Sequence, residues 1–378
     1  MVFIGFLDGF DVAPDSSPWE ITRDRVPYMK PNRFNWLNEI LLRRVKLTTN
    51  GIARIKPILH RVEILKLKFS YFRDQTKEFY ENFLQFCSNL KHLCIKSGRD
   101  NIVGIDNKWL LRKYPMLEHL ELVSSPAKPI IELETFFNQN LNIKHLALNV
   151  EFLLANLTTI KNIQHKFNVM SIFFGICRNK YALAGDALND LYEMGRFMEL
   201  HVYYRALCCP FDKTSVDELM SYQGLTKLHT NHYKNSVDLS PLNTLQELCY
   251  FGKRSLITNV QVLAKSLINL EIIHFLNAEL SDIMPFIQYS LKLKKIIIYN
   301  LKVNENVLDV NILDNERKTL ITARKITIYV ERDIYLATKR TKTGTKLNFI
   351  EVKCGASLNI RHDFDYKDDA YQDEEFYH

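Results

Sequence analysis

Residues 90–95, Leu-Lys-His-Leu-Cys-Ile, and residues 117–122, Leu-Glu-His-Leu-Glu-Leu, share one apolar pattern: an apolar residue, two others, an apolar residue, one other and a final apolar residue. Residues 62–67 and 143–148 repeat the same pattern. Its last two apolar positions are two residues apart, so they point to the same face of a β-strand. The pattern therefore predicts short strands that bury one face, and each strand needs neighbours to complete its core.

The pattern recurs along most of the chain, in thirteen copies whose starts are 20 to 30 residues apart. The copies are Leu42-Val45-Leu47, Val62-Leu65-Leu67, Leu90-Leu93-Ile95, Leu117-Leu120-Leu122, Ile143-Leu146-Leu148, Phe167-Met170-Ile172, Phe197-Leu200-Val202, Leu225-Leu228-Thr230, Leu245-Leu248-Tyr250, Leu270-Ile273-Phe275, Leu293-Ile296-Ile298, Ala323-Ile326-Ile328 and Leu347-Ile350-Val352. This spacing matches the leucine-rich repeat, whose period is roughly 20–29 residues. We therefore predict an α/β leucine-rich-repeat solenoid of about 13 repeats, with a curved parallel sheet on the concave face and helices and loops on the convex face.

The segments between the strands and at the two ends suggest the domain limits. Apolar residues at steps of three and four predict connecting helices within 78–90, 212–220 and 256–270. We expect an irregular arm at 1–37, a short helix around 34–42 that caps the first strand, and a solenoid over 38–362 that ends in strands near 325–330 and 347–353. Residues 363–378 hold seven acidic residues and one lysine, which predicts an acidic tail.

Composition and motifs exclude several classes of protein. The chain has 378 residues, of which 47% are hydrophobic and 25% charged, as in a folded protein. Its seven cysteines form no CxxC pair, which favours reduced thiols in a cytoplasmic or nuclear protein. No apolar run is long enough to cross a membrane. No GxSxG, GxxxxGK[ST], HExxH or GxGxxG motif occurs, so we expect no enzyme, no cofactor and no metal.

Three segments resemble one protein family. Residues 36–49, WLNEILLRRVKLTT, 315–339, NERKTLITARKITIYVERDIYLATK, and 349–366, FIEVKCGASLNIRHDFDY, resemble the leucine-rich-repeat portion of insect F-box/leucine-rich-repeat proteins. The resemblance implies the substrate-recognition half of an SCF-type ubiquitin ligase receptor. No helical F-box pattern is visible in residues 1–37, so we do not expect the Skp adaptor to bind this chain. Either an upstream F-box is missing, or the chain binds clients without recruiting a ligase.

Side chains between the buried strand positions should line the concave face, where three sets of residues suggest a binding surface. His92, His119 and His145 occupy the same position in successive repeats, and adjacent strands lie about 4.8 Å apart. We expect a ladder of imidazoles, which splays its nitrogens too far for one zinc ion. The ladder is therefore either a recognition surface or a set of incidental histidines.

The other two sets are aromatic and basic. The aromatic set, which is typical of protein-binding anchors unless loops cover it, is predicted as one row: Phe173, Tyr203, Phe251, Tyr299 and Tyr329. The basic set at the N-terminal end of the groove is Lys46, Lys66, Lys68 and Lys96. These lysines suit an acidic client, the acidic tail or nucleic acid, or form a plain solvated face. The leading interpretation is a non-enzymatic scaffold that binds a protein client on the concave face, and the alternative is a solenoid that binds nucleic acid on the basic groove.

Overall fold

A computed structural model of the chain describes residues 19–20, 39–43, 45–47, 56–68, 71–72, 79–96, 107–124, 126, 128–174, 181–204, 211–230, 237–250, 260–301, 307–320, 322, 324–341 and 347–355. The chain divides into two compact units. Unit 1 contains residues 1–173 and 180–200, and unit 2 contains residues 174–179 and 201–378. In the described part of the chain, no helix is long and apolar enough to cross a membrane.

The strands confirm the predicted solenoid of about 13 repeats. Thirteen strands form one parallel sheet, and they follow one another across it in sequence order. They are Glu39–Arg43 (β2), Ile64–Lys68 (β4), His92–Lys96 (β6), His119–Val123 (β7), His145–Asn149 (β8), Phe167–Phe174 (β9), Phe197–Tyr204 (β10), Leu225–Thr230 (β11), Glu247–Tyr250 (β12), Ile272–Ala278 (β13), Lys295–Leu301 (β14), Ile326–Val330 (β15) and Ile350–Cys354 (β16).

Strand register follows the apolar pattern. Leu93 pairs with Leu120, and Leu120 pairs with Leu146, so the middle apolar residues of successive repeats lie side by side. These middle residues are at most 1% exposed, as predicted: Leu65, Leu93, Leu120, Leu146, Leu200, Leu228, Leu248, Ile273 and Ile296. Each strand thus adds one layer to a shared core, which no single repeat could form alone.

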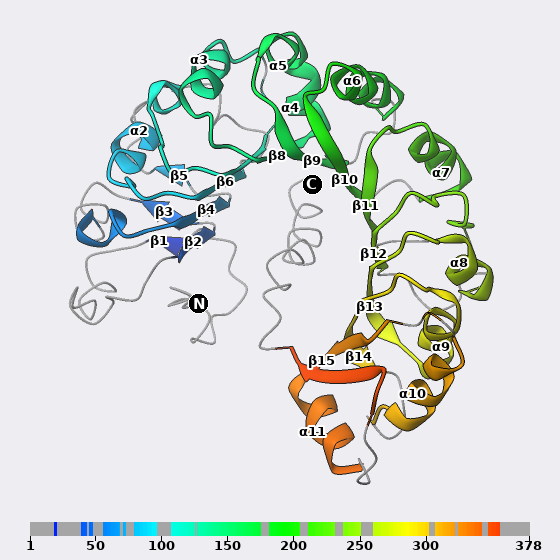
Figure 1. Ribbon diagram of the computed structural model, residues 1–378. Helices are drawn as coiled ribbons and strands as arrows, with labels where there is room; N and C mark the ends of the chain where they lie inside the picture. The colour runs from blue at the N-terminus through cyan, green and yellow to red at the C-terminus, as the bar shows by residue number, and fades with distance from the viewer. Residues whose placement is uncertain are drawn as a thin grey trace, which may run out of the picture. The chain divides into compact units, whose positions relative to one another are not determined.

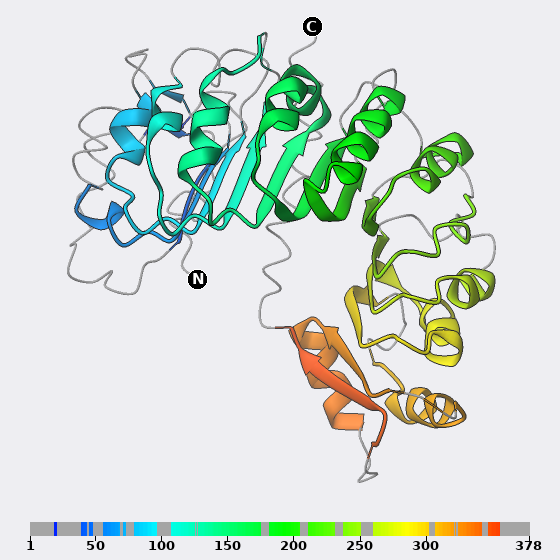
Figure 2. The same ribbon diagram turned by 45° about the horizontal axis from the view of Figure 1, so that its top comes forward.

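Helices return the chain between strands, and in each unit they lie on one side of the sheet (Figures 1 and 2). They are Phe79–Leu84 (α2), the 3-10 helix Lys108–Leu111 (η2), Glu132–Gln139 (α3), Val150–Ala155 (α4), Leu157–Asn162 (α5), Tyr181–Glu193 (α6), Lys213–Met220 (α7), Val260–Ser266 (α8), Leu280–Tyr289 (α9), Val310–Lys318 (α10) and Arg332–Thr341 (α11). The predicted helices within 78–90, 212–220 and 256–270 are confirmed as α2, α7 and α8. Asp212 caps α7 by accepting a hydrogen bond from the backbone N–H of Ser215 at 3.0 Å.

The first repeat differs from the prediction. The helix expected around 34–42 is wrong, because Glu39–Arg43 forms β2, whose Ile40 and Leu42 pair with Leu65 and Leu67. Val45–Leu47 (β3), predicted as the first strand of the solenoid, instead lies between Trp19–Glu20 (β1) and Tyr71–Phe72 (β5) in a three-stranded parallel sheet. Leu42 belongs to two overlapping copies of the apolar pattern, since it ends one copy and begins the next. Pairing with β4 selects the copy that ends at Leu42.

Buried asparagines join neighbouring repeats in unit 1. Asn140 accepts a hydrogen bond from the backbone N–H of Tyr114 at 2.5 Å and donates to the carbonyl of Phe136 at 2.8 Å. Asn156 makes the equivalent bonds one repeat later, with Ile130 and Phe152. Each amide side chain therefore satisfies backbone groups that the turns would otherwise leave buried and unpaired.

At the end of unit 2, two charged residues of α10 form hydrogen bonds with buried backbone groups. Asp314 accepts backbone hydrogen bonds from Phe349 and Ile350, at 2.7 and 2.8 Å, and so anchors β16. Arg317 is fully buried and donates to the carbonyls of Ile287, at 3.0 Å, and Ser290, at 2.9 Å. The predicted strands near 325–330 and 347–353 are confirmed as β15 and β16. The predicted acidic tail, 363–378, lies outside the described residues.

Candidate functional site

We call the side of the sheet opposite the helices the non-helical face. Residues that alternate with the buried core positions point to this face. In unit 1 one row across it consists of Ile64, His92, His119, His145 and Val169, which pair in register on five successive strands. The structure therefore confirms that the three histidines lie side by side on neighbouring strands, as predicted.

The three histidine rings contact one another. The ring centroids of His92 and His119 are 3.9 Å apart and stacked, and those of His119 and His145 are 4.1 Å apart and tilted. Burial lowers the pKa of His92 to about 4 and that of His119 to about 3, and the neighbouring lysines Lys66 and Lys96 contribute to the first of these shifts. His145 forms a 2.6 Å hydrogen bond with the hydroxyl of Ser171 through Nε2. The two stacked imidazoles are therefore neutral at pH 7.

A buried ion pair lies beside the ladder. Lys96 Nζ is 2.7 Å from Glu121 Oε1, and the two side chains are 5% and 12% exposed. The same ammonium lies 5.0 Å from the ring centroid of Phe173 on β9. Burial alone would raise the pKa of the Glu121 carboxyl, but Lys96 outweighs it and lowers this pKa to about 2. A lysine thus lies between a carboxylate and an aromatic ring.

The histidine ladder makes folding sensitive to acid. The unfolded pKa of histidine is near 6.5, so between pH 6.5 and 4 the unfolded chain binds protons that His92 and His119 do not bind when folded. Stability from this source is complete above pH 6.5 and decreases as pH falls. We expect the urea midpoint of unfolding to drop between pH 7.5 and 5, and His119→Asn to reduce that drop.

The matched control is His60→Asn, which replaces an exposed histidine. It should leave the drop unchanged. An identical pH dependence in the wild type and in His119→Asn would contradict the assignment of this acid sensitivity to the ladder.

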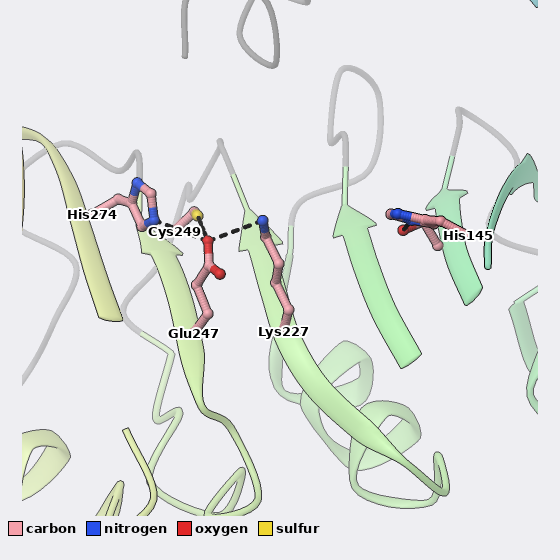
Figure 3. Close-up of polar contacts among 6 residues, drawn as sticks. His145, Lys227, Glu247, Cys249 and His274 are labelled. Atoms are coloured by element: carbon pink, nitrogen blue, oxygen red, sulfur yellow. Dashed lines mark hydrogen bonds and ion pairs between the residues drawn. The ribbon is translucent and has the colours of Figure 1, made fainter. Parts of the chain in front are cut away.

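Unit 2 carries a second polar cluster on the same face (Figure 3). Lys227 of β11 and His274 of β13 both approach one oxygen of Glu247 on β12: Lys227 Nζ and His274 Nε2 each lie 2.9 Å from Oε1. Cys249 Sγ is 3.7 Å from the same oxygen. Lys227 Nζ also lies 5.5 Å from the ring centroid of Tyr203 on β10, so the arrangement of lysine, carboxylate and aromatic ring recurs here.

The electrostatics of this cluster favour charge on the lysine and the carboxylate. Burial would raise the pKa of Glu247, but the hydrogen bond from His274 and the charge of Lys227 hold it well below its usual range. Burial would lower the pKa of Lys227, yet Tyr203, Cys249 and Glu247 together raise it. His229, which pairs in register with Cys249, has its pKa lowered to about 3 by burial and by Lys227.

Among the described residues there are two groups of three potential metal ligands. Within each group the ligand atoms lie within 4.8 Å of one another. The groups are His92, His119 and Glu121 in unit 1, and Glu247, Cys249 and His274 in unit 2. The prediction that the histidine ladder splays its nitrogens too far concerned three imidazoles alone. The carboxylate of Glu121, two residues after His119 on β7, forms a closer group with two of these imidazoles.

The predicted basic set does not form one exposed charged surface. Lys96 is buried in its ion pair, and Lys66 Nζ lies 3.3 Å from Glu39 Oε1. Lys46 is on β3 and pairs with Tyr71 in the three-stranded sheet, so its predicted place beside Lys66 is wrong. The Lys68 backbone pairs with Lys96, and its side chain lies outside the described part of the structure.

The aromatic set does not form one row. Tyr329 pairs with Ile297 and is therefore two positions out of the predicted alignment with Tyr299. Tyr299 is only 7% exposed and packs in an apolar cluster with Cys249 and Ile297, against which Tyr329 also packs, so the expectation of an exposed anchor at Tyr299 is wrong. Phe173 and Tyr203 are partly exposed as expected, and Phe251 lies outside the described residues.

Sequence reasoning missed the two carboxylates that organise these clusters. Neither Glu121 nor Glu247 was among the residues predicted to bind a partner. The available signal was Glu247-Leu248-Cys249, since residues two apart on a strand share a face, followed by His274 at the equivalent position one repeat later. Lysine and carboxylate on neighbouring strands are also a favourable cross-strand pair.

The fold defines the chain as an α/β solenoid of about 13 repeats. No protein-family model matches the sequence, and the search of curated proteins gives no match.

Proposed function

We propose that the chain is a non-enzymatic scaffold that binds a protein partner on the non-helical face of its sheet. One observation carries the proposal: in each unit a partly exposed aromatic ring is braced by an ion-paired lysine. Phe173 is held by Lys96 in unit 1, and Tyr203 by Lys227 in unit 2. Aromatic side chains held in place before binding lose little conformational freedom on association, which is what binding hot spots require.

The resemblance to F-box/leucine-rich-repeat proteins supports a ubiquitin-ligase client as the partner. The alternative function, binding of nucleic acid, depends on lysines that are available to phosphate groups. Lys66 and Lys96 are instead ion-paired with Glu39 and Glu121. Ion-paired lysines would have to break these pairs to neutralise phosphates. A protein partner needs no such exchange.

Site-specific photo-cross-linking in cells would identify the partner. A photoreactive residue is placed at Val169 or Thr327 on the non-helical face, or at the exposed Leu183 or Met220 on helices α6 and α7 as controls. We expect the same protein adduct from the first two positions and not from the controls. Adducts from the helical positions alone would reject the proposed face.

The purified partner then tests the aromatic anchors. Phe173→Ser and Tyr203→Ser should each weaken binding about 30-fold or more, since a hot-spot aromatic contributes about 2 kcal/mol or more, and the double variant should weaken it further. The control is Tyr289→Ser on α9, a partly exposed tyrosine that also contacts a lysine, with Lys265 Nζ 4.5 Å from its ring centroid. Unchanged binding by the double variant would contradict the proposal. Nucleic-acid adducts with a steep loss of binding in salt would favour the alternative.

A further inference from the structure

The polar cluster of unit 2 contains more than an ion pair. Glu247 and Cys249 lie two residues apart on β12 and point to the same face, and Cys249 pairs in register with His274 on β13. A carboxylate, a thiol and an imidazole therefore converge from two neighbouring strands (Figure 3). The parallel sheet fixes the backbone positions of all three, so little has to move to bring their ligand atoms together.

Two of the three side chains are buried, and one nitrogen of His274 has no hydrogen-bond partner among the described residues. Cys249 is 3% exposed and His274 is 7% exposed. Nε2 of His274 is used by Glu247, whereas its Nδ1 is buried and has no hydrogen-bond partner among the described residues. Because no described group occupies Nδ1, this nitrogen can carry the ring proton when Nε2 becomes a ligand.

The donor set identifies the ligand. From the convergence of thiol, imidazole and carboxylate we propose that Glu247, Cys249 and His274 bind a zinc ion. Sulfur and nitrogen donors favour Zn²⁺ over Mg²⁺ and Ca²⁺, which prefer oxygen. Tetrahedral zinc with bonds of about 2.0–2.3 Å sets its ligand atoms roughly 3.3–3.8 Å apart. The ligand atoms here lie within 4.8 Å of one another, so each pair has to approach by at most about 1–1.5 Å, which side-chain rotation can supply.

Charge favours this group over His92, His119 and Glu121. In unit 1 two carboxylates are matched by Lys66 and Lys96, and the imidazoles are neutral, so an added dication meets no net negative charge. In unit 2 the carboxylate of Glu247 is matched by Lys227, but the thiol of Cys249 adds a negative charge when it ionises. Of the two groups found among the described residues, the one in unit 2 is therefore the one that offers an anionic sulfur to the metal.

Zinc binding has a defined proton balance. The Cys249 S–H bond breaks, its proton leaves to solvent, and the thiolate forms the Zn–S bond. The proton on Nε2 of His274 moves to Nδ1 through exchange with solvent, and Nε2 then coordinates the ion. One oxygen of Glu247 binds the metal while the other remains for Lys227. One proton is released for each zinc ion bound, as expected for a thiol that becomes a ligand.

The wild-type chain can be tested without mutation. The full chain is treated with chelator, titrated with ZnCl₂ in two buffers of different ionisation enthalpy, and separately titrated with CoCl₂. We expect one zinc ion per chain, release of about one proton and a thiolate-to-cobalt charge-transfer band that saturates at one equivalent. Absence of that band, or zinc binding without proton release, would overturn the proposal.

Conservative variants locate the ion. Cys249→Ser and His274→Gln should each weaken zinc binding about 100-fold or more, because they remove direct ligands. Cys94→Ser is the matched control, since Cys94 is an equally buried cysteine at the equivalent position of β6. It should keep wild-type affinity and the cobalt band. Circular dichroism verifies folding, and loss of binding in His119→Asn together with its retention in Cys249→Ser would place the metal on the histidine ladder and reject this site.

Discussion

Glu121→Gln is expected to lower the free energy of unfolding by about 3–5 kcal/mol, because it leaves the ammonium of Lys96 buried without its counter-charge. Lys96 is 5% exposed, and its Nζ lies 2.7 Å from the Glu121 carboxylate. Glutamine has nearly the same shape as glutamate, so the loss reports charge rather than packing. Urea unfolding followed by circular dichroism would show it as a lower midpoint.

The double variant Lys96→Met with Glu121→Leu removes both charges, and it should restore the midpoint to that of the wild type or above. Glu118→Gln provides the matched control, since Glu118 pairs with Lys144 at 3.0 Å on the surface and the two side chains are 55% and 59% exposed. An exposed pair of this kind contributes about 0–1 kcal/mol. If Glu121→Gln and Glu118→Gln lowered the unfolding midpoint equally, the pair of Lys96 and Glu121 would not be a buried interaction.

Leu120→Asp is expected to destabilise the chain by about 3–5 kcal/mol, because it places a carboxylate in the core that the strands share. Leu120 is 0% exposed, and its neighbours in register are Leu93 and Leu146. A solenoid distributes its stability over contacts between adjacent repeats, so a defect in β7 also weakens β6 and β8. Hydrogen exchange should show lost protection in these three strands first.

Leu141→Asp is the control for this variant. Leu141 is in the same unit and is 68% exposed, so its replacement should change stability by less than about 0.5 kcal/mol. A wild-type unfolding midpoint for Leu120→Asp would contradict the register of β7.

The apolar pattern was sufficient to predict the fold because the repeat is local. Leu65, Leu93 and Leu120 each belong to a six-residue pattern that contains its own strand, and stacking such strands has one solution, a parallel sheet in sequence order. The pattern failed at residues 37–47, where Leu42 belongs to two overlapping versions of it. Pairing with β4 decided between them, and this pairing is a tertiary contact.

The candidate site was predicted less well, since it depends on side chains from different repeats. Alternation along each strand placed His92, His119 and His145 in one row, and the strand register bears this out. Alternation could not show that Lys96 reaches across to both Glu121 and Phe173, because a lysine side chain has many rotamers. Nor could it show that β15 is shifted by two residues, which removes Tyr329 from the row of Tyr299.

The sequence by itself determined the repeat, the strand order and the residues that face away from the helices, because each follows from periodicity within a few consecutive residues. Only the tertiary structure decided which of those residues interact. Lys227 and His274 both contact Glu247 because neighbouring parallel strands bring residues 20 and 27 positions away to the same carboxylate oxygen. Burial between strands then sets the ionisation of these groups, and burial is a property of the packed sheet rather than of any one repeat.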